Sequence, residues 1–211
     1  MADVILIRPI SDSWPGEAYV RNLSIPHGPL VLAAHLVDKG FTVKIIDEIA
    51  LTEVIEDKVS DIALDQVRNL LKEPTVCIGI TSMTGEQIRR GKIYASLVKK
   101  INPKIPIVWG GAHPTLLPEM TLADKDVDII VAGEGDISFP KLVSELKKNG
   151  TGNISKIPGI HYVDKNGKEH KTKPARLFNM NLMPEIPYHL IDMEKYIKKI
   201  KKKDKPLKGK C

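Results

Sequence analysis

The sequence has few cysteines and no long apolar run. Its 211 residues include two cysteines, Cys77 and Cys211, which excludes a disulfide framework and favours a reducing compartment. No stretch approaches the roughly 18 consecutive apolar residues of a membrane span. The residues after Met1 lack the basic and apolar regions of a signal peptide. We therefore expect a cytoplasmic protein without a membrane span.

The body of the chain also lacks net charge. Residues 192–211 carry nine lysines against three acids, whereas residues 1–191 carry 23 basic and 23 acidic residues. The formal charge of +6 therefore resides in the C-terminal tail, which excludes a basic nucleic-acid surface on the body. A lysine-rich tail of this kind is typical of a solvated or disordered segment.

The sequence does contain a regular alternation of apolar strands and amphipathic helices. Hydrophobic residues make up 42% of the chain, which is enough for one core with an extension. Five apolar segments separated by helical patterns predict an α/β fold, a doubly wound parallel sheet of five strands in the flavodoxin-like order 2-1-3-4-5. The predicted strands are residues 4–7, 42–46, 76–80, 105–109 and 128–131.

The pattern changes after Gly150. Asn166-Gly167 lies between two short β-type segments and predicts a β-hairpin. The prolines Pro174, Pro184 and Pro187 then indicate a connector. We accordingly divide the chain into a domain at residues 1–150, a hairpin and connector at residues 151–191 and a basic tail at residues 192–211.

Small and polar residues gather where the predicted strands end. Gly110-Gly111 follows one strand, Ser82-Met83-Thr84 follows another and Gly133-Glu134-Gly135 follows a third, while a long loop at residues 10–27 follows the first. In an open α/β sheet the carboxyl ends of the strands form the edge where ligands bind. Two adjacent glycines remove both Cβ atoms there and allow the backbone to approach a ligand closely.

These segments resemble the cobalamin-binding domain at the amino terminus of cobalamin-dependent radical S-adenosylmethionine enzymes. That class includes the anaerobic magnesium-protoporphyrin monomethyl ester cyclase. The similarity lies in four stretches that occur in the family's order: residues 29–36 with Gly40, residues 79–84, residues 109–115 and residues 133–135. Residues 157–160 and 183–196 are similar to the linker that leads to the catalytic barrel of such enzymes.

The resemblance implies that the nucleotide tail of a cobalamin enters this edge of the sheet. The implied cofactor-binding residues are Ser82, Met83, Thr84, Gly110, Gly111, His113, Gly133, Glu134 and Gly135. In this set Ser82 and Thr84 hydrogen-bond the tail and the two adjacent glycines give it room. Ser82 and Thr84 also suit capping of the next helix, His113 suits a helix cap or packing, and Glu134 suits the dipole of the helix that follows it.

The loop after the first strand departs from the pattern of related methyltransferase and mutase domains. Those domains carry Asp-x-His-x-x-Gly there, with the histidine bound to cobalt and the aspartate fixing its tautomer. Residues 10–27 contain no such motif, and Ile25 stands two residues before His27. His27 is thus a candidate cobalt ligand, and the alternative is a histidine in a loop or at the start of a helix. The resemblance implies a base-off cobalamin without a protein histidine, as is common in the radical enzymes.

In the radical enzymes the linker leads to a CxxxCxxC motif that binds a [4Fe-4S] cluster and S-adenosylmethionine. Cys211 is a candidate for the first cysteine of that motif if the chain is truncated. The leading hypothesis is therefore a cobalamin-binding module of a radical S-adenosylmethionine enzyme, of methyltransferase or tetrapyrrole-cyclase type. Such a module would not be catalytic alone and would act with a catalytic domain in the same chain or in a separate one.

Two alternatives remain open at this point. The first is a free-standing corrinoid sensor or carrier with the same fold. The second is a flavodoxin-like nucleotide or flavin-binding protein, which is disfavoured because residues 10–16 contain one glycine and no phosphate-binding pattern. Asp47, directly after the second strand, is interpreted as a strand-end cap rather than a ribose ligand, because no GxGxxG follows the first strand.

Overall fold

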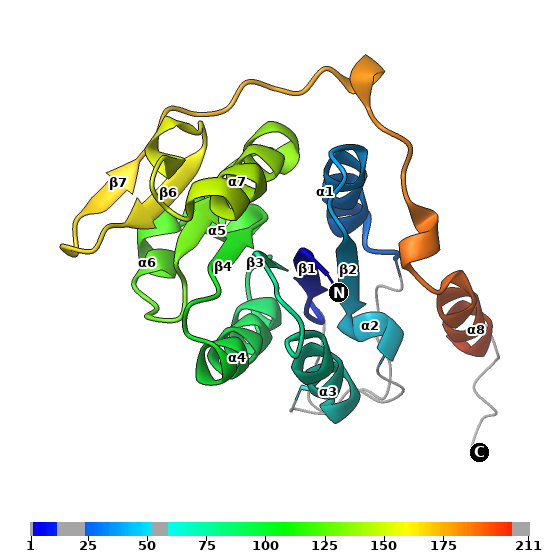
Figure 1. The fold of residues 1–211 in the computed structure, drawn as a ribbon. Coiled ribbons are helices and arrows are strands. Elements are labelled where there is room, and N and C mark those ends of the chain that lie inside the picture. The colour runs from blue at the N-terminus through cyan, green and yellow to red at the C-terminus, as the bar shows by residue number, and fades with distance from the viewer. Residues whose placement is uncertain (1, 12–23, 52–58, 204–211) are drawn as a thin grey trace.

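The computed structural model describes residues 2–11, 24–51 and 59–203, and within them one seven-stranded sheet has the order β2-β1-β3-β4-β5-β6-β7 (Figure 1). The strands are β1 (Val4–Arg8), β2 (Val43–Asp47), β3 (Cys77–Thr81), β4 (Ile107–Gly110), β5 (Ile129–Val131), β6 (Ile160–Val163) and β7 (Glu169–Lys171). The first five strands are parallel. Their predicted order 2-1-3-4-5 is confirmed, and so is the doubly wound fold.

The sheet has seven strands rather than the predicted five because the hairpin β6–β7 joins it. β6 pairs antiparallel with β5, in a register that sets Ile130 opposite His161. A strand at the edge of a sheet presents unpaired backbone N–H and C=O groups. The hairpin therefore satisfies the edge of β5 that a five-stranded sheet would leave open.

Helices cover the two faces of the sheet in pairs (Figure 1). The helices are α1 (His27–Asp38), α2 (Glu48–Leu51), α3 (Asp61–Leu70), α4 (Glu86–Ile101), α5 (Ala112–Leu116), α6 (Pro118–Leu122), α7 (Gly135–Asn149) and α8 (Met193–Lys203). We call the side covered by α1 and α7 the α1/α7 face, and the opposite side the α3/α4 face.

Alternation along the strands divides the core between these faces. Leu6 and Val108 belong to the cluster on the α1/α7 face, whereas Ile7 and Trp109 belong to the cluster on the α3/α4 face. Because successive side chains of a strand point to opposite faces, the continuous apolar run at residues 4–7 of β1 is buried on both sides. The same alternation decides which residues can reach a ligand on either face.

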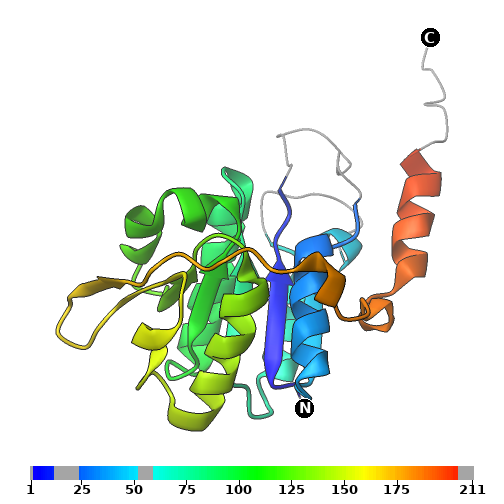
Figure 2. The ribbon, with the colours of Figure 1, turned by 90° about the horizontal axis from the view of Figure 1, so that it is seen from above.

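The connector runs from the hairpin across the outside of α7 and α1 (Figures 1 and 2). It contains two turns of 3₁₀ helix, at Met180–Leu182 and Tyr188–Leu190. The ring of Phe178 packs edge-on against His35 of α1, with the ring centroids 4.6 Å apart. The segment is thus in contact with the body through a specific aromatic pair.

Residues 193–203 of the basic tail form helix α8, which corrects the prediction of a solvated or disordered segment for this part. Tyr196 is buried, and its hydroxyl donates a hydrogen bond to Asp47. Arg8 donates to both oxygens of the same carboxylate, at 2.9 and 2.7 Å. The helix forms because this contact with a distant residue stabilises it, and Asp47 has the structural role that we expected for it.

Burial and the neighbouring charge of Asp47 both raise the pKa of Tyr196. The phenol therefore stays protonated and remains a hydrogen-bond donor at neutral pH.

Within the parts of the chain that the structure describes, none of the helices combines the length and the apolar character of a membrane span.

Candidate functional site

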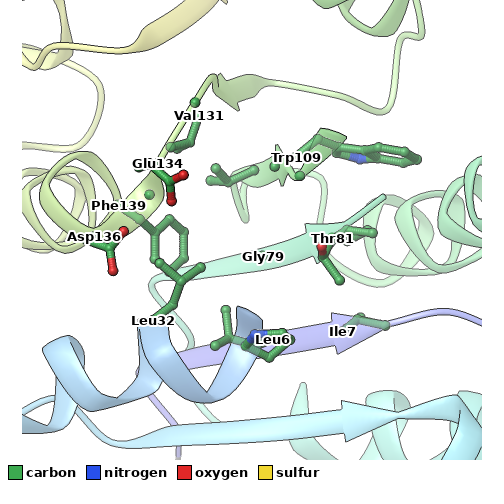
Figure 3. A pocket seen from close by; sticks show the side chains of 17 residues that line it. Leu6, Ile7, Leu32, Gly79, Thr81, Trp109, Val131, Glu134, Asp136 and Phe139 are labelled. Atoms are coloured by element: carbon green, nitrogen blue, oxygen red, sulfur yellow. The ribbon is translucent and has the colours of Figure 1, made fainter. Parts of the chain in front are cut away.

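A cavity of about 170 Å³ lies between the carboxyl-terminal halves of the central strands and the helices α1 and α7 (Figure 3). Most of its lining is apolar or glycine, and its polar side chains are those of Thr81, Glu134 and Asp136. The lining residues are Leu6, Ile7, Pro29, Leu32, Gly79, Ile80, Thr81, Val108, Trp109, Gly110, Gly111, Val131, Gly133, Glu134, Gly135, Asp136 and Phe139.

Two strand glycines, Gly79 and Gly110, line this cavity for different physical reasons. Gly79 is in register with Leu6 and Val108, so a side chain on it would point to the α1/α7 face. A Cβ atom at Gly79 would lie 2.7 Å from Leu6 Cδ2 and 3.2 Å from Phe139 Cζ. Glycine at position 79 therefore makes room for the Leu6 and Phe139 side chains, which pack over the strand there and line the cavity.

Gly110 extends the same space toward the sheet edge. It lies two residues after Val108 and in register with Thr81, and so on the same face as both. A Cβ atom at Gly110 would meet only the carbonyl oxygen of Val131, at 3.6 Å, which is an ordinary contact. The fold alone would accept a side chain at Gly110, so its absence leaves open space rather than relieving a clash.

Glycine stands at position 111 for a different physical reason than at position 110. Its φ is +98°, and a Cβ atom there would lie 2.8 Å from the carbonyl oxygen of Ser82. Ser82 also donates its N–H to the Gly110 carbonyl at 2.8 Å and accepts from the N–H of His113 at 3.1 Å. Glycine at position 111 therefore serves the close packing of the β3 and β4 ends, although the residue also lines the cavity.

The Gly133–Gly135 segment carries the chain from β5 into α7 beside the cavity. Gly133 has a φ of +81°, and Glu134 is exposed. A Cβ atom at Gly135 would lie 2.9 Å from Leu32 Cδ2, so this glycine lets α7 approach α1 closely. All three residues of the predicted segment line the cavity, together with Gly110 and Gly111.

The other predicted cofactor-binding residues surround the strand ends without lining the cavity. Ser82 is buried and its hydroxyl donates to the Met83 carbonyl at 2.8 Å. Met83 and Thr84 are exposed. His113 is buried, and its Nδ1 has no hydrogen-bond partner among the described residues. These four residues remain predictions for a ligand that extends beyond the cavity.

Several lining residues were not predicted from the sequence. Thr81 precedes the predicted Ser82-Met83-Thr84 and lines the cavity because it lies two residues after Gly79, on the same face. That period of two is a signal that could have identified it. Asp136 was missed as well, and its partner His35 lies 101 residues away in the chain.

The two candidates for metal ligation are His27 and Cys211, and the structure describes the first of them. His27 is the first residue of α1 and is exposed. Cys211 lies outside the described residues, as does most of the predicted loop at residues 10–27. Among the residues that the structure describes, no group of three or more His, Cys, Asp or Glu side chains is arranged to hold a metal ion.

Comparisons with known proteins connect this geometry to a family. The B12 binding domain family matches residues 18–143. The chain is 30% identical over 189 residues to an uncharacterized methyltransferase of Pyrococcus horikoshii, an alignment that covers 86% of this chain and 38% of that protein. It is 28% identical over 197 residues to the cytidylyl-2-hydroxyethylphosphonate methyltransferase of Streptomyces wedmorensis, covering 87% and 35% of the two chains. The chain thus spans little more than a third of the length of these relatives.

A solved structure shares the fold. The cobalamin-dependent S-adenosylmethionine radical enzyme OxsB, with aqua-cobalamin and S-adenosylmethionine bound, superposes with a TM-score of 0.65 at 18% identity. The match covers 94% of this chain and 25% of that one. It therefore includes the hairpin and the connector as well as the parallel sheet.

Proposed function

The chain belongs to the family of B12 binding domains, and from this premise we propose that its cavity holds the nucleotide tail of a base-off cobalamin. The protein would be the cobalamin-binding module of a radical S-adenosylmethionine enzyme of methyltransferase or tetrapyrrole-cyclase type, active in the cytoplasm. Residues 1–150 would form the cofactor-binding unit, and residues 151–211 would lead from it toward the catalytic part.

The observation that carries the proposal is the open space at Gly110 on the α1/α7 face, where the fold would accept a side chain. Gly110 leaves a slot at the end of β4, and Leu6, Val108 and Phe139 also line it. Pockets that hold an entire small ligand measure about 300–1,000 Å³, and this one measures about 170 Å³. The slot therefore suits a flat, largely apolar portion of a larger molecule, such as the base of a nucleotide tail.

The remainder of the cofactor would lie over the carboxyl ends of the strands. Met83 after β3 and Leu116 in α5 are 58% and 72% exposed and offer an apolar surface near that edge. Ser82, Thr84 and His113 would supply polar contacts beside it. When bound, a cobalamin provides cobalt chemistry that no amino-acid side chain offers, whereas the role of this chain is to bind and orient it.

The catalytic partner is proposed from the relatives. The chain is similar to little more than a third of each curated methyltransferase and to a quarter of the cobalamin-dependent radical enzyme. A domain that binds a [4Fe-4S] cluster and S-adenosylmethionine would act on the substrate, either in the same protein or in a separate chain. The cobalamin-binding part would then present the cofactor to it.

Titration with hydroxocobalamin tests this function. We expect the purified chain to retain corrin absorbance through gel filtration, and Gly110→Leu to weaken the affinity about a hundredfold or more because the leucine fills the slot. Gly110→Ala should weaken it less, since one methyl group meets only the Val131 carbonyl. Thermal unfolding of each variant checks that the fold is intact.

Gly110 is a better test position than Gly111. A leucine at position 111 would combine a φ of +98° with a clash against the Ser82 carbonyl, and so would strain the fold as well as the slot. If the wild-type chain binds no corrin, or if Gly110→Leu binds as tightly as the wild type, the proposed use of the cavity is wrong.

A further inference from the structure

Two of the polar side chains of the cavity lie on opposite sides of it. In Figure 3 Thr81 lies toward the carboxyl ends of the strands, and Asp136 lies on the other side, beyond Phe139. Apolar side chains such as Leu6 and Leu32 line the cavity between these two sides. A group that fills the cavity therefore meets a hydroxyl at one side and a carboxylate at the other.

His35 holds the carboxylate of Asp136. Its Nε2 lies 3.2 Å from Asp136 Oδ1, and the two side chains are 7% and 12% exposed. Because an ionised carboxylate only accepts hydrogen bonds, Nε2 carries the hydrogen of this contact. Phe178 packs edge-on against the same imidazole, with an interplanar angle of 76°. The ring is thus in contact with the carboxylate and with the connector.

The second carboxylate oxygen determines what Asp136 can recognise. Oδ2 has no hydrogen-bond partner within the described parts of the chain. A carboxylate oxygen that loses water without gaining a donor is unfavourable. The group of a ligand that faces Asp136 must therefore carry an O–H or N–H, whereas a methyl group or a phosphate there would bind less well.

We propose that Asp136 accepts a hydrogen bond from a donor on the nucleotide tail of the bound corrinoid, and that His35 positions Asp136 for this contact. The inference rests on the proposed function. Two sources supply such a donor: the ribose hydroxyls that every complete tail carries, or a hydroxyl on the lower base. Dimethylbenzimidazole, the base of cobalamin, has no donor of its own.

Three corrinoids distinguish these sources when titrated against the 211-residue chain. Dicyanocobinamide has no nucleotide tail, the nucleotide of hydroxocobalamin has only its ribose hydroxyls as donors, and 5-hydroxybenzimidazolyl cobamide adds a hydroxyl on the base. We expect Asp136→Ala to weaken binding of tail-bearing ligands about tenfold or more, while dicyanocobinamide binding stays unchanged. Asp136→Asn keeps one acceptor oxygen and should lie between Asp136→Ala and the wild type.

The pattern of loss identifies the donor. An equal loss for both tail-bearing ligands assigns the contact to the ribose, and a loss confined to 5-hydroxybenzimidazolyl cobamide assigns it to the base. An unchanged affinity for both, or an equal loss for all three corrinoids, would overturn the inference while leaving the proposed function in place. Failure of the wild type to bind any corrinoid would overturn both.

The positioning role of His35 has its own test. His35→Gln keeps an N–H donor at about the position of Nε2, whereas His35→Leu removes it. We expect His35→Leu to lose the same tail-dependent affinity as Asp136→Ala, and His35→Gln to retain most of it. A purely structural histidine would make both variants bind alike at equal thermal stability, and that result would contradict the positioning role.

Discussion

Gly91 and Gly110 lie on opposite faces of the same central strands and serve opposite purposes. On the α3/α4 face the strand carries Trp109 and the glycine lies on the helix, where a Cβ atom at Gly91 would lie 2.7 Å from Trp109 Cη2. On the α1/α7 face Gly79 likewise makes room for Leu6 and Phe139, whereas a Cβ atom at Gly110 would meet only the Val131 carbonyl oxygen, at 3.6 Å. The indole fills the space at Gly91, and the space at Gly110 stays open as part of the cavity.

This difference separates a glycine that improves packing from one that leaves a cavity. A helix glycine opposite a large strand residue lets two elements approach, which preserves the close packing of a protein interior. Gly110 instead leaves a space in which no described side chain lies within 4 Å of the Cβ position. The α1/α7 face thus gives up contacts that would stabilise the fold, which is expected where a ligand binds.

The sharpest test makes the same substitution on both faces. Gly91→Leu should lower the free energy of unfolding by about 1–3 kcal/mol, because crowding against Trp109 outweighs the roughly 1 kcal/mol that a helix gains on losing glycine. The corrinoid affinity of the folded protein should stay unchanged. Gly110→Leu should show the reverse, with a lost affinity and an unfolding free energy close to that of the wild type.

Urea unfolding and hydroxocobalamin titration measure the two quantities separately. The comparison of the faces would fail if Gly91→Leu lost corrinoid affinity while it remained folded. It would also fail if Gly110→Leu unfolded as readily as Gly91→Leu, since Gly110 would then be required by the fold.

The sheet and its relation to the family could be predicted because their signals are local. Each parallel strand is an apolar run bounded by turn residues, and α4 occupies residues 86–101 as its apolar spacing indicated. The resemblance to the cobalamin-binding domain is confirmed by the family that matches residues 18–143. Gly110, Gly111 and residues 133–135 do line a cavity at the predicted edge.

Features that depend on contacts between distant segments could not be predicted. The hairpin joins the sheet because β6 pairs with β5, and nothing within residues 159–173 encodes that choice. The same is true of the contact between His35 and Asp136. Helix α8 follows a lysine-rich pattern that predicts a solvated tail, and its docking depends on distant partners, Asp47 for Tyr196 and the Ile49 carbonyl for Lys199.

Helix α8 offers a smaller test, because it lies outside both faces of the sheet. Tyr196→Phe removes one hydrogen bond to Asp47, which keeps its contacts with Arg8. We expect the free energy of unfolding to fall by about 1 kcal/mol and the amides of α8 to exchange faster with solvent. Corrinoid affinity should not change, since neither residue lines the cavity. A parallel loss of affinity would mean that corrinoid binding on the α1/α7 face depends on the docking of helix α8.

The smallest expected effect reports on the α1/α7 face directly. Cys77 begins β3 on this face, two residues before Gly79, and burial raises the pKa of its thiol to about 12. Below pH 9 the native thiol is therefore protonated and unreactive, and a thiol reagent reaches it only when the face opens. In a Cys211→Ser background, hydroxocobalamin at its dissociation constant should halve the labelling rate, because bound ligand removes half of the molecules that can open. Gly110→Leu should show no such protection, and equal protection in that variant would place the cofactor away from the slot.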